Sequence, residues 1–333
     1  MKLEDVAKRA QVSIATVSRV LNNSNTVKNT TKARVLRAIR DLKYHPNIHA
    51  RNLAGGRSRT FGMIVSNLEN PFFLDIFRAL ESEAHRNEYE VVVSNTDYEA
   101  KQLLNSVHLM ISRRVAGLAV IVSEMEPTLM QELSDANLPV VLYDVGVPTH
   151  NISSIKVNYQ RGIQRTVEYL YSLGHRRMTF VGHHTSLSPL LDRKTSFVEA
   201  VKHYGRDVQF TTVADRDGPN GGEQAMRTVL ASGFNPTAII CVNDFMALGV
   251  LKALRERGLR VPGDISVTGY DNISLSEFAC PALTTVNIPR EKIGHLAFEA
   301  LIRHQEGKSV SGLEFIIETE LVIRDSTGLP PQI

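Results

Sequence analysis

The sequence predicts an α/β protein: an N-terminal helix-turn-helix domain of three helices, followed by a two-lobed core of doubly wound parallel sheets. Residues 1–45 contain three short helical patterns, whereas from Thr60 onward apolar runs of strand length alternate with amphipathic helical stretches. Near-continuous apolar strands separated by helices are typical of parallel sheets that are covered on both faces. The length of 333 residues is sufficient for two or three domains.

Basic residues are concentrated at the N-terminus. Residues 1–60 contain 13 Lys and Arg against three acidic residues, a net charge of +10, whereas the rest of the chain has 25 basic and 32 acidic residues. A basic segment attached to an acidic body is the electrostatic signature of a module that binds a polyanion. The positive charge alone is equally consistent with a solvated helical surface. The helical patterns decide between this alternative and a module that binds a polyanion.

Three helical patterns occupy this basic segment. The first and third span residues 3–10 and 31–44, and both repeat apolar residues at helical spacing. Between them lies "SIATVSRVLNNS", which begins at a potential N-cap serine and places three apolar residues on one face: Val17, Val20 and Leu21. Two short helices joined by a tight turn, with a third packed across them, form a helix-turn-helix domain.

The other face of the second helix suits the DNA major groove, where the second helix of such a domain contacts base edges. Arg19 can bind a guanine through two hydrogen bonds, and Ile14 and Ala15 can contact a thymine methyl group. Polar side chains on this face can bind phosphates and fix the position of the helix along the DNA. They are Thr16, Ser18 and Asn22, and Ser13 at the start of the helix completes the candidate DNA-binding set.

Several motifs follow one another without a gap over the first fifty residues: "LEDVAKRAQVSIATVSRVLNNS", "V-x-x-x-T-x-x-R-V", "L-x-Y-x-P-N" and "A-R-x-L". They resemble the headpiece of the LacI family of bacterial transcription repressors. The resemblance implies that residues 1–45 are a DNA-binding headpiece and that residues 46–59 are a hinge. In this family the hinge forms a short helix in the minor groove of operator DNA.

Two hinge residues are expected to contact DNA by this resemblance. Leu53 falls where the family places a leucine between base pairs, and Ala50 lies one turn earlier on the same side. An apolar wedge of this kind unstacks a base step and bends the duplex. A plain interdomain linker is the alternative, because two glycines and a basic "RSR" follow.

The headpiece departs from the family pattern at two positions. Gln11 stands where the family often has Gly or Asn, residues that adopt a left-handed turn more readily. Lys28 replaces the usual serine cap of the third helix, so we expect Asn29 or Thr30 to cap that helix instead. Both departures concern the stability of the headpiece and leave the recognition face unchanged.

The remainder of the chain contains eight apolar runs of strand length. They span residues 61–67, 89–96, 116–122, 139–144, 178–183, 208–214, 238–244 and 265–271. Helical patterns lie between them, for example at 72–87, 161–175 and 245–258. Eight such units exceed one open sheet, so we expect two doubly wound lobes that divide near residues 155–160. Ligands of such sheets bind beyond the carboxyl ends of the strands, where this chain has Asn67, Asp144, His183, Asp244 and Asp271.

Five further motifs extend the family resemblance over the core: "NPFF" (70–73), "DR-x-x-x-F" (192–197), "NDFMALG" (243–249), "GYDN" (269–272) and "PALTTV" (281–286). They are similar to the LacI family's effector-binding core, which itself resembles periplasmic sugar-binding proteins. The resemblance implies one core over residues 60–333. Its first lobe would comprise about 60–157 and 290–318, and its second lobe about 158–289 and 319–333.

The same resemblance implies an effector site between the lobes, where the effector is the small molecule that controls DNA affinity. Phe72 and Phe73 would stack on the ligand, and Asp144 would accept hydrogen bonds from it. The second lobe would contribute Arg193, Asn243, Asp244 and Asp271. Aromatic faces with carboxylates and an arginine suit a hydroxyl-rich ring. The two phenylalanines could instead belong to the core, and Asp244 could cap the helix that follows it.

A sugar or sugar derivative is the expected effector, and a nucleobase is the alternative. Many relatives have a glutamine in the crossover after "LTTV", where this chain has Ile288, so one hydrogen bond to the effector could be missing. A solute-binding transport protein of the same fold is a further alternative. The basic headpiece and the charged N-terminus, which lacks a secretory signal, argue against it.

Enzyme, cofactor, metal and membrane functions lack their sequence signatures. The chain has no GxGxxG, GxxxxGK[ST], GxSxG or HExxH motif. His183 and His184 have no third ligand at suitable spacing, so we expect no metal and no cofactor. No apolar run approaches the length of a membrane span. We therefore expect a cytoplasmic protein.

The expected partners are palindromic double-stranded operator DNA, the effector and a second copy of the chain. Two headpieces and paired hinge helices would bind the two halves of the operator. Tetramers of the family use a leucine-repeat helix at the C-terminus. Because this chain ends in "DSTGLPPQI", we expect a homodimer.

Overall fold

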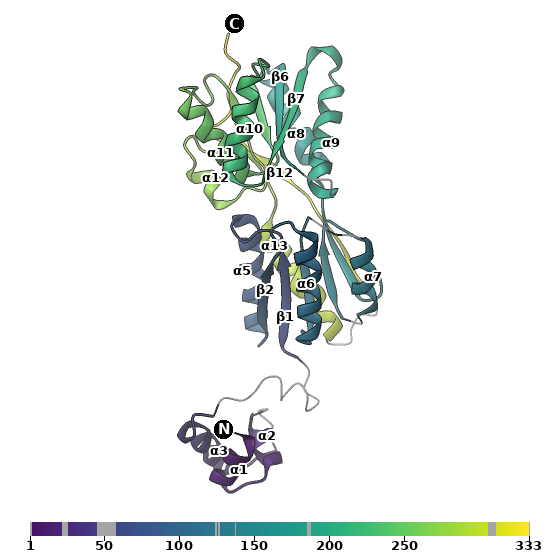
Figure 1. Cartoon of the computed structure of the whole chain (residues 1–333), viewed down its shortest axis with the longest axis vertical. Helices are drawn as coiled ribbons and strands as arrows, with labels where there is room; N and C mark the ends of the chain where they lie inside the picture. The colour runs from purple at the N-terminus through teal and green to yellow at the C-terminus, as the bar shows by residue number, and fades with distance from the viewer. Residues whose placement is uncertain are drawn as a thin grey trace. The chain divides into compact units, whose positions relative to one another are not determined.

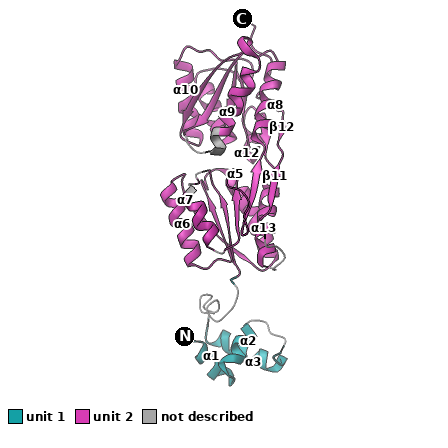
Figure 2. Ribbon diagram, turned by 90° about the vertical axis from the view of Figure 1, so that its right-hand side faces the viewer, with its two compact units in different colours: residues 1–58 teal, residues 59–333 magenta. Residues whose placement is uncertain are grey.

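The computed structural model describes residues 2–21, 26–44, 58–123, 125, 127–136, 138–184, 188–305 and 311–332. The chain divides into two compact units, residues 1–58 and residues 59–333 (Figures 1 and 2). Within the described residues, no helix is both long and apolar enough to cross a membrane.

The described part of the N-terminal unit contains three helices: α1 (Leu3–Ala10), α2 (Ile14–Leu21) and α3 (Asn29–Asp41). Their apolar faces meet in a small core made of Val6, Ala7, Ala10, Val17, Val20, Val35 and Ala38. The helix-turn-helix arrangement predicted from the helical patterns is therefore present.

The helix ends of this unit show how the two departures from the family pattern are accommodated. Gln11 ends α1 in the left-handed conformation, with a φ of 50°. Ser13 caps α2, since its hydroxyl accepts the backbone N–H of Thr16 at 3.2 Å. The prediction for α3 was wrong, because the helix already begins at Asn29. Lys28 occupies the N-cap position and makes no side-chain cap hydrogen bond.

The first lobe of the larger unit is built on a six-stranded parallel sheet with the order β11-β5-β4-β3-β1-β2. The strands are β1 (Thr60–Val65), β2 (Glu90–Asn95), β3 (Gly117–Ile121), β4 (Val140–Tyr143), β5 (Ile152–Val157) and β11 (Glu314–Ile317). Its helices are α5 (Pro71–Arg86), α6 (Ala100–Ser112), α7 (Pro127–Asp135) and α13 (Arg290–Gln305). Figure 1 shows α13 beside α5, although they lie far apart in the sequence.

Both faces of this sheet are buried, as its near-continuous apolar strands predict. Along β1, Phe61, Met63 and Val65 join the core that contains α5 and α13. Ile64 points to the opposite face and joins the core beneath α6 and α7. This alternation is the period of two that a strand imposes on its side chains.

The second lobe has a four-stranded parallel sheet with the order β7-β6-β8-β9. Its strands are β6 (Arg177–His183), β7 (Gln209–Asp215), β8 (Ala238–Cys241) and β9 (Ser266–Thr268). The helices are α8 (Tyr159–Ser172), α9 (Ser188–Lys202), α10 (Pro219–Ala231), α11 (Asp244–Glu256) and the short α12 (Ser274–Phe278), with a 3-10 turn, η1, at Gly205–Asp207. Helices α8 and α9 contact each other, as do α10 and α11 (Figure 1).

The chain passes between the lobes three times. It leaves the first lobe after β5, returns to it between β10 (Thr285–Asn287) and α13, and leaves again between β11 and β12 (Glu320–Val322). Strands β10 and β12 pair antiparallel with each other. The predicted fold class, two doubly wound lobes after a helix-turn-helix domain, is confirmed.

All eight predicted strands are present, but the sequence pattern missed β5. Its two serines, Ser153 and Ser154, interrupt the apolar pattern and are nevertheless buried. The Ser153 hydroxyl accepts the backbone N–H of Leu313 at 3.0 Å. The pattern also missed the short strands β10, β11 and β12. Of the two cysteines, Cys241 is buried and Cys280 is exposed.

Candidate DNA-binding helix and effector site

The outer face of α2 presents the side chains that the sequence predicted for DNA contact. Ile14, 47% exposed, and Ala15 and Arg19 are exposed, whereas Val17 and Val20 are buried on the opposite face. Thr16 and Ser18 lie at the edge and are half-buried. The Thr16 hydroxyl is 2.9 Å from that of Ser13, so both of these hydroxyls have an internal partner. Asn22, Ala50 and Leu53 lie outside the described residues.

The order of the strands predicts where a ligand of the core would bind. In both sheets the order reverses beside the first strand, between β1 and β3 and between β6 and β8. Ligands of doubly wound sheets bind at such switch points, beyond the carboxyl ends of the strands. Asn67 follows β1, and His183 ends β6.

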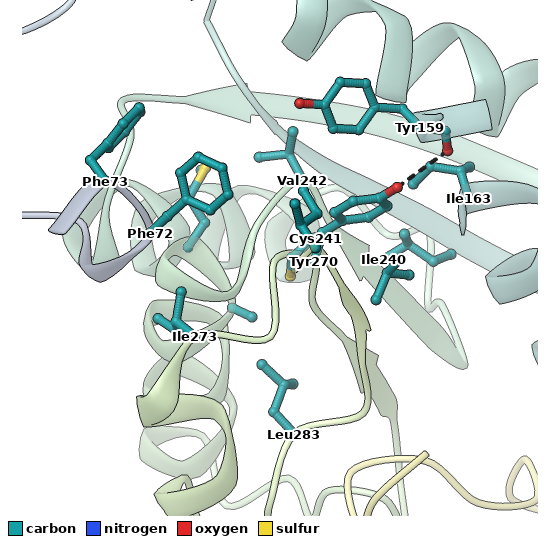
Figure 3. Packing of buried hydrophobic residues seen from close by; sticks show 14 of the residues in the cluster. Phe72, Phe73, Tyr159, Ile163, Ile240, Cys241, Val242, Tyr270, Ile273 and Leu283 are labelled. Carbon is teal, nitrogen blue, oxygen red and sulfur yellow. Dashed lines mark hydrogen bonds between the residues drawn. The ribbon is translucent and has the colours of Figure 1, made fainter. Parts of the chain in front are cut away.

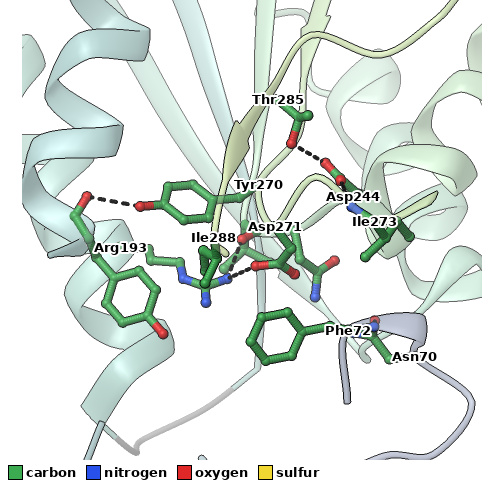
Figure 4. A network of polar contacts seen from close by, with 12 residues as sticks. Asn70, Phe72, Arg193, Asp244, Tyr270, Asp271, Ile273, Thr285 and Ile288 are labelled. Carbon is green, nitrogen blue, oxygen red and sulfur yellow. Dashed lines mark hydrogen bonds and ion pairs between the residues drawn. The ribbon is translucent and has the colours of Figure 1, made fainter. Parts of the chain in front are cut away.

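Arg193 lies near this edge of the second lobe and is only 5% exposed. Its guanidinium donates a hydrogen bond to the Val242 carbonyl at 2.7 Å and lies 3.5 Å from a carboxylate oxygen of Asp271 (Figure 4). The rings of Tyr159 and Tyr270 flank it, with centroids 4.3 and 4.8 Å from the guanidinium carbon. Burial alone would lower the pKa of Arg193, but its neighbours raise the pKa above the ordinary value, so the side chain stays charged.

Two atoms of this buried pair have no hydrogen-bond partner among the described residues. They are Nε of Arg193 and Oδ1 of Asp271. A buried polar atom without a partner is costly, and native structures rarely leave one without a reason. The pair therefore has unused hydrogen-bonding capacity at the place where the topology predicts a ligand.

Asp144 lies at the end of β4 with a φ of 58°. Its carboxylate accepts the Val157 N–H at 2.8 Å and the Tyr159 hydroxyl, which also lies 2.9 Å from the hydroxyl of Tyr143. Burial raises the pKa of Asp144 to about 7, against the lowering effect of these hydrogen bonds. Burial also raises the pKa of Asp271 to about 7, although Arg193 and Arg290 oppose the shift.

Phe72 and Phe73 both lie in the hydrophobic core, each 5% exposed (Figure 3). Their rings meet edge to face with centroids 5.2 Å apart. Phe72 also contacts Tyr143, at 5.9 Å between ring centroids. Of the two, Phe72 is thus linked to the tyrosines around Arg193, whereas Phe73 contacts Phe72.

The structure separates the roles of Asn243 and Asp244. Asn243, not Asp244, caps α11, since its side-chain oxygen accepts the Met246 N–H at 2.8 Å. Asp244 is fully buried, and its two oxygens accept bonds from the Ile273 N–H and the Thr285 hydroxyl (Figure 4). Asp244 therefore helps to hold the second lobe together, and we leave it out of the proposed ligand site because it is 0% exposed.

Several residues of this site were not predicted from the sequence. The three tyrosines around Arg193, namely Tyr143, Tyr159 and Tyr270, and the carboxylate of Asp217 were not singled out. Tyr143 and Tyr270 directly precede the candidates Asp144 and Asp271, and this position in the sequence is the one signal that could have identified them.

Ile288, at the position where many relatives have a glutamine, is fully buried. Within the described part of the chain, no cluster of three or more His, Cys, Asp or Glu could hold a metal ion.

Together, the helix-turn-helix domain and the two-lobed core define the class of protein. Residues 2–47 match the model of bacterial regulatory proteins of the LacI family, and residues 167–327 match that of a periplasmic binding protein-like domain. The chain belongs to the LacI family and is a DNA-binding transcription repressor. Members of this family are not enzymes.

Particular relatives are similar over nearly the whole chain. The HTH-type transcriptional repressor PurR of Pasteurella multocida is 33% identical over 326 residues, covering 97% of this chain and 98% of the relative. The Lac repressor dimer bound to operator and the anti-inducer ONPF has a TM-score of 0.84 at 29% identity, covering 98% and 99% of the two chains. The CelR–cellobiose complex has a TM-score of 0.72 at 27% identity, with the same coverage.

Proposed function

We propose that this repressor is a cytoplasmic homodimer whose affinity for a palindromic operator is controlled by a sugar or sugar derivative bound between its lobes. The buried Arg193–Asp271 pair carries this proposal, because each side chain has an atom without a hydrogen-bond partner among the described residues: Nε of Arg193, and Oδ1 of Asp271, which faces the guanidinium at 3.5 Å. Ligand hydroxyls can donate to the carboxylate and accept from the guanidinium at once. Charge-assisted bonds of this kind are stronger than those between neutral groups.

The proposed ligand site comprises Phe72, Asp144, Arg193, Asn243 and Asp271. Carboxylates and an amide dominate it, and these groups suit the hydroxyls of a sugar better than the few polar atoms of a nucleobase. The similarity to a regulator bound to cellobiose supports the same class of ligand. A nucleobase is the second candidate, because the rings of Phe72 and Tyr143 provide flat apolar surfaces for stacking.

In the proposed DNA complex, α2 enters the major groove and residues 46–59 form the hinge in the minor groove, with Leu53 as the wedge. The exposed face of α2 and the basic charge of the first 60 residues support this arrangement. A similar repressor was crystallised as a dimer on its operator, which supports a dimer here.

A thermal-shift screen of the full-length protein tests the ligand class. The panel contains D-ribose, D-xylose, D-glucose and cellobiose, the phosphate esters ribose 5-phosphate and glucose 6-phosphate, and the nucleobases hypoxanthine and guanine. A ligand at 100 times its Kd stabilises the native state by ~2.7 kcal/mol, so a true effector raises the Tm clearly. We expect a sugar to do so. A shift with nucleobases alone would overturn the sugar assignment and favour the second candidate.

A further inference from the structure

A second group of polar side chains lies next to the Arg193–Asp271 pair and joins the two lobes. We propose that His183 and Asp217, supported by Tyr98, bind a hydroxyl at the other end of the ligand and restrict the site to neutral sugars rather than sugar phosphates. This inference rests on the proposed function, since it concerns the ligand of the same site.

Asp217 connects the lobes through one carboxylate. Its Oδ2 accepts the Tyr98 hydroxyl at 2.8 Å and the Asn67 side-chain amide at 3.4 Å, and both of these residues follow strands of the first lobe. Its Oδ1 accepts the side-chain amide of Asn243 from the second lobe at 2.9 Å. A carboxylate oxygen has room for a further donor, so a ligand hydroxyl can join these bonds.

His183 provides a ring nitrogen that can bind the ligand at this end of the site. It is half-buried at the end of β6, and its ring lies 5.0 Å from that of Tyr98. Its Nδ1 is buried and has no hydrogen-bond partner among the described residues. Burial lowers the pKa of His183, although Asp217 opposes the shift, so the ring is neutral near pH 7. A neutral imidazole has one donor and one acceptor nitrogen, and a hydroxyl can pair with either.

This group is continuous with the Arg193–Asp271 pair. Val242, whose carbonyl accepts the Arg193 bond, directly precedes Asn243, which donates to Asp217. His183 and Asn67 also lie at the two switch points where the topology predicts a ligand. A single molecule can therefore contact both groups.

Charge decides which sugars fit. Asp217 presents a carboxylate at this end of the site, and His183 presents a neutral ring rather than a cation. A phosphate held against Asp217 would meet a like charge, and unpaired like charges in a partly desolvated site are strongly unfavourable. A hydroxyl donates a charge-assisted hydrogen bond to the same oxygen instead.

Titration calorimetry of the full-length protein and two variants tests this proposal with D-ribose, D-xylose, D-glucose and cellobiose as neutral probes. Ribose 5-phosphate and glucose 6-phosphate are the matched anions. Asp217→Asn keeps the size of the side chain but removes its charge, and His183→Phe keeps a ring against Tyr98 but removes both nitrogens. We expect each variant to bind the neutral sugar that binds the wild type at least 10-fold more weakly. We also expect the ratio of the Kd of the phosphate ester to the Kd of its parent sugar to be smaller for Asp217→Asn than for the wild type.

Substitutions of a neighbouring aspartate and a neighbouring histidine serve as matched controls. Asp215→Asn and His184→Phe change the same residue types next to the site and should leave sugar affinity at the wild-type level. Thermal melts without ligand show whether each variant is folded, and Tyr98→Phe offers a milder change if Asp217→Asn does not fold.

If all folded variants bind the neutral sugar with wild-type affinity, this inference is overturned, whereas the proposed function is not. Tighter binding of a phosphate ester than of its parent sugar would overturn it too, but would leave a sugar derivative as the effector. Binding of none of these sugars or esters would overturn both proposals.

Discussion

Arg193 illustrates how a charged side chain is kept in the interior of this protein. Its guanidinium contacts a carbonyl, a carboxylate and two aromatic rings, all contributed by residues distant from it in the sequence. An arginine suits this position because its planar group can stack on rings and donate in several directions at once. The same contacts leave Nε without a hydrogen-bond partner among the residues that the structure describes, which makes Arg193 the best candidate for recognising the ligand.

Arg19 is the residue expected to read a base. Replacement by Ala removes a potential bidentate contact to guanine, so operator binding should weaken by ~1–3 kcal/mol and preference should relax at one base pair of each half-site. Fluorescence anisotropy with an operator selected from random DNA by the wild-type protein measures both effects. Equal weakening on operator and random DNA would instead make Arg19 a phosphate contact.

Asp144 should make stability depend on pH. Its pKa in the folded protein is about 7, above the ordinary value of 3.8. The folded state then binds more protons than the unfolded state between these values, so this residue makes the unfolding free energy fall as pH rises from about 4 to about 7. Asp144→Asn cannot ionise and should lack this contribution.

Urea unfolding of the wild type and Asp144→Asn at several pH values checks this prediction. The unfolding free energy of the variant minus that of the wild type should increase with pH over the same range. Taking the difference removes the contributions of other titrating groups, such as His175 and His183, whose pKa values are lowered by burial. A constant difference across the range would show that Asp144 is ionised throughout.

At the level of elements, α10 and α11 pack with their backbones unusually close. A Cβ added at Gly249 of α11 would lie 1.8 Å from the Pro219 carbonyl oxygen, and one at Gly222 of α10 would lie 2.0 Å from the Met246 oxygen. These glycines therefore permit the helix contact. Because α11 begins directly after Asn243, their packing also sets the position of a candidate ligand-binding residue.

Gly249→Ala should force the two helices apart. Overpacking of this kind typically costs ~1–3 kcal/mol, and the rigid backbone atom it meets leaves little room for relaxation. Thermal unfolding should show a lower Tm than the wild type. Gly263→Ala is the matched control, because a Cβ there meets only side-chain atoms at 3.5 Å or more. Similar melting of the two variants would contradict the close packing of α10 and α11.

Another link between elements is provided by Arg290 at the start of α13. Its side chain pairs with Asp75 of α5 at 2.9 Å and donates to the backbone carbonyl of Asp271. Asp75 lies one turn after Phe72 on the same helix. One side chain thus ties the helix that contains Phe72 to the segment that contains Asp271, across the two lobes.

At the level of the whole molecule, ligand contacts from both lobes would favour one relative orientation of the lobes. Three crossovers and the Asp217 bonds connect the lobes, and β1 of the first lobe directly follows the proposed hinge. A change in lobe orientation can therefore reach the DNA-binding segment. Coupling of this kind is reciprocal, so the factor by which ligand changes DNA affinity equals the factor by which DNA changes ligand affinity.

Arg193→Ala should uncouple the two sites. The ligand-free variant should bind the selected operator as the wild type does, but the sugar identified in the screen should no longer change that affinity. Anisotropy titrations with and without the sugar measure this response. Removing one partner of a buried pair is also destabilising, so a melt must show that the variant is folded, and Arg193→Lys retains the charge. Loss of operator binding by a folded, ligand-free variant would show that Arg193 serves DNA binding through the fold rather than the response to ligand.

The sequence by itself determined the features that depend on local pattern. Helical periodicity and a serine cap specified α2 and its exposed face, and apolar runs of strand length specified eight strands, because each local segment needs only its own spacing to form. Polar residues at the strand ends indicated the edge of the sheets where Asp144, His183 and Asp271 lie. These predictions required no knowledge of distant contacts.

Only the tertiary structure decided what depends on residues far apart in the sequence. Strand β5 forms despite Ser153 and Ser154 because neighbouring strands satisfy its backbone and bury it. Asp244 and Asp271 both follow strands as polar residues. The oxygens of Asp244 accept hydrogen bonds from Thr285 and Ile273. Asp271 instead retains an oxygen with no hydrogen-bond partner among the described residues. Asp217 gained its partners from the other lobe only when Tyr98 and Asn67 came within hydrogen-bonding distance. Such partnerships are set by how the chain folds back on itself, and no local spacing encodes them.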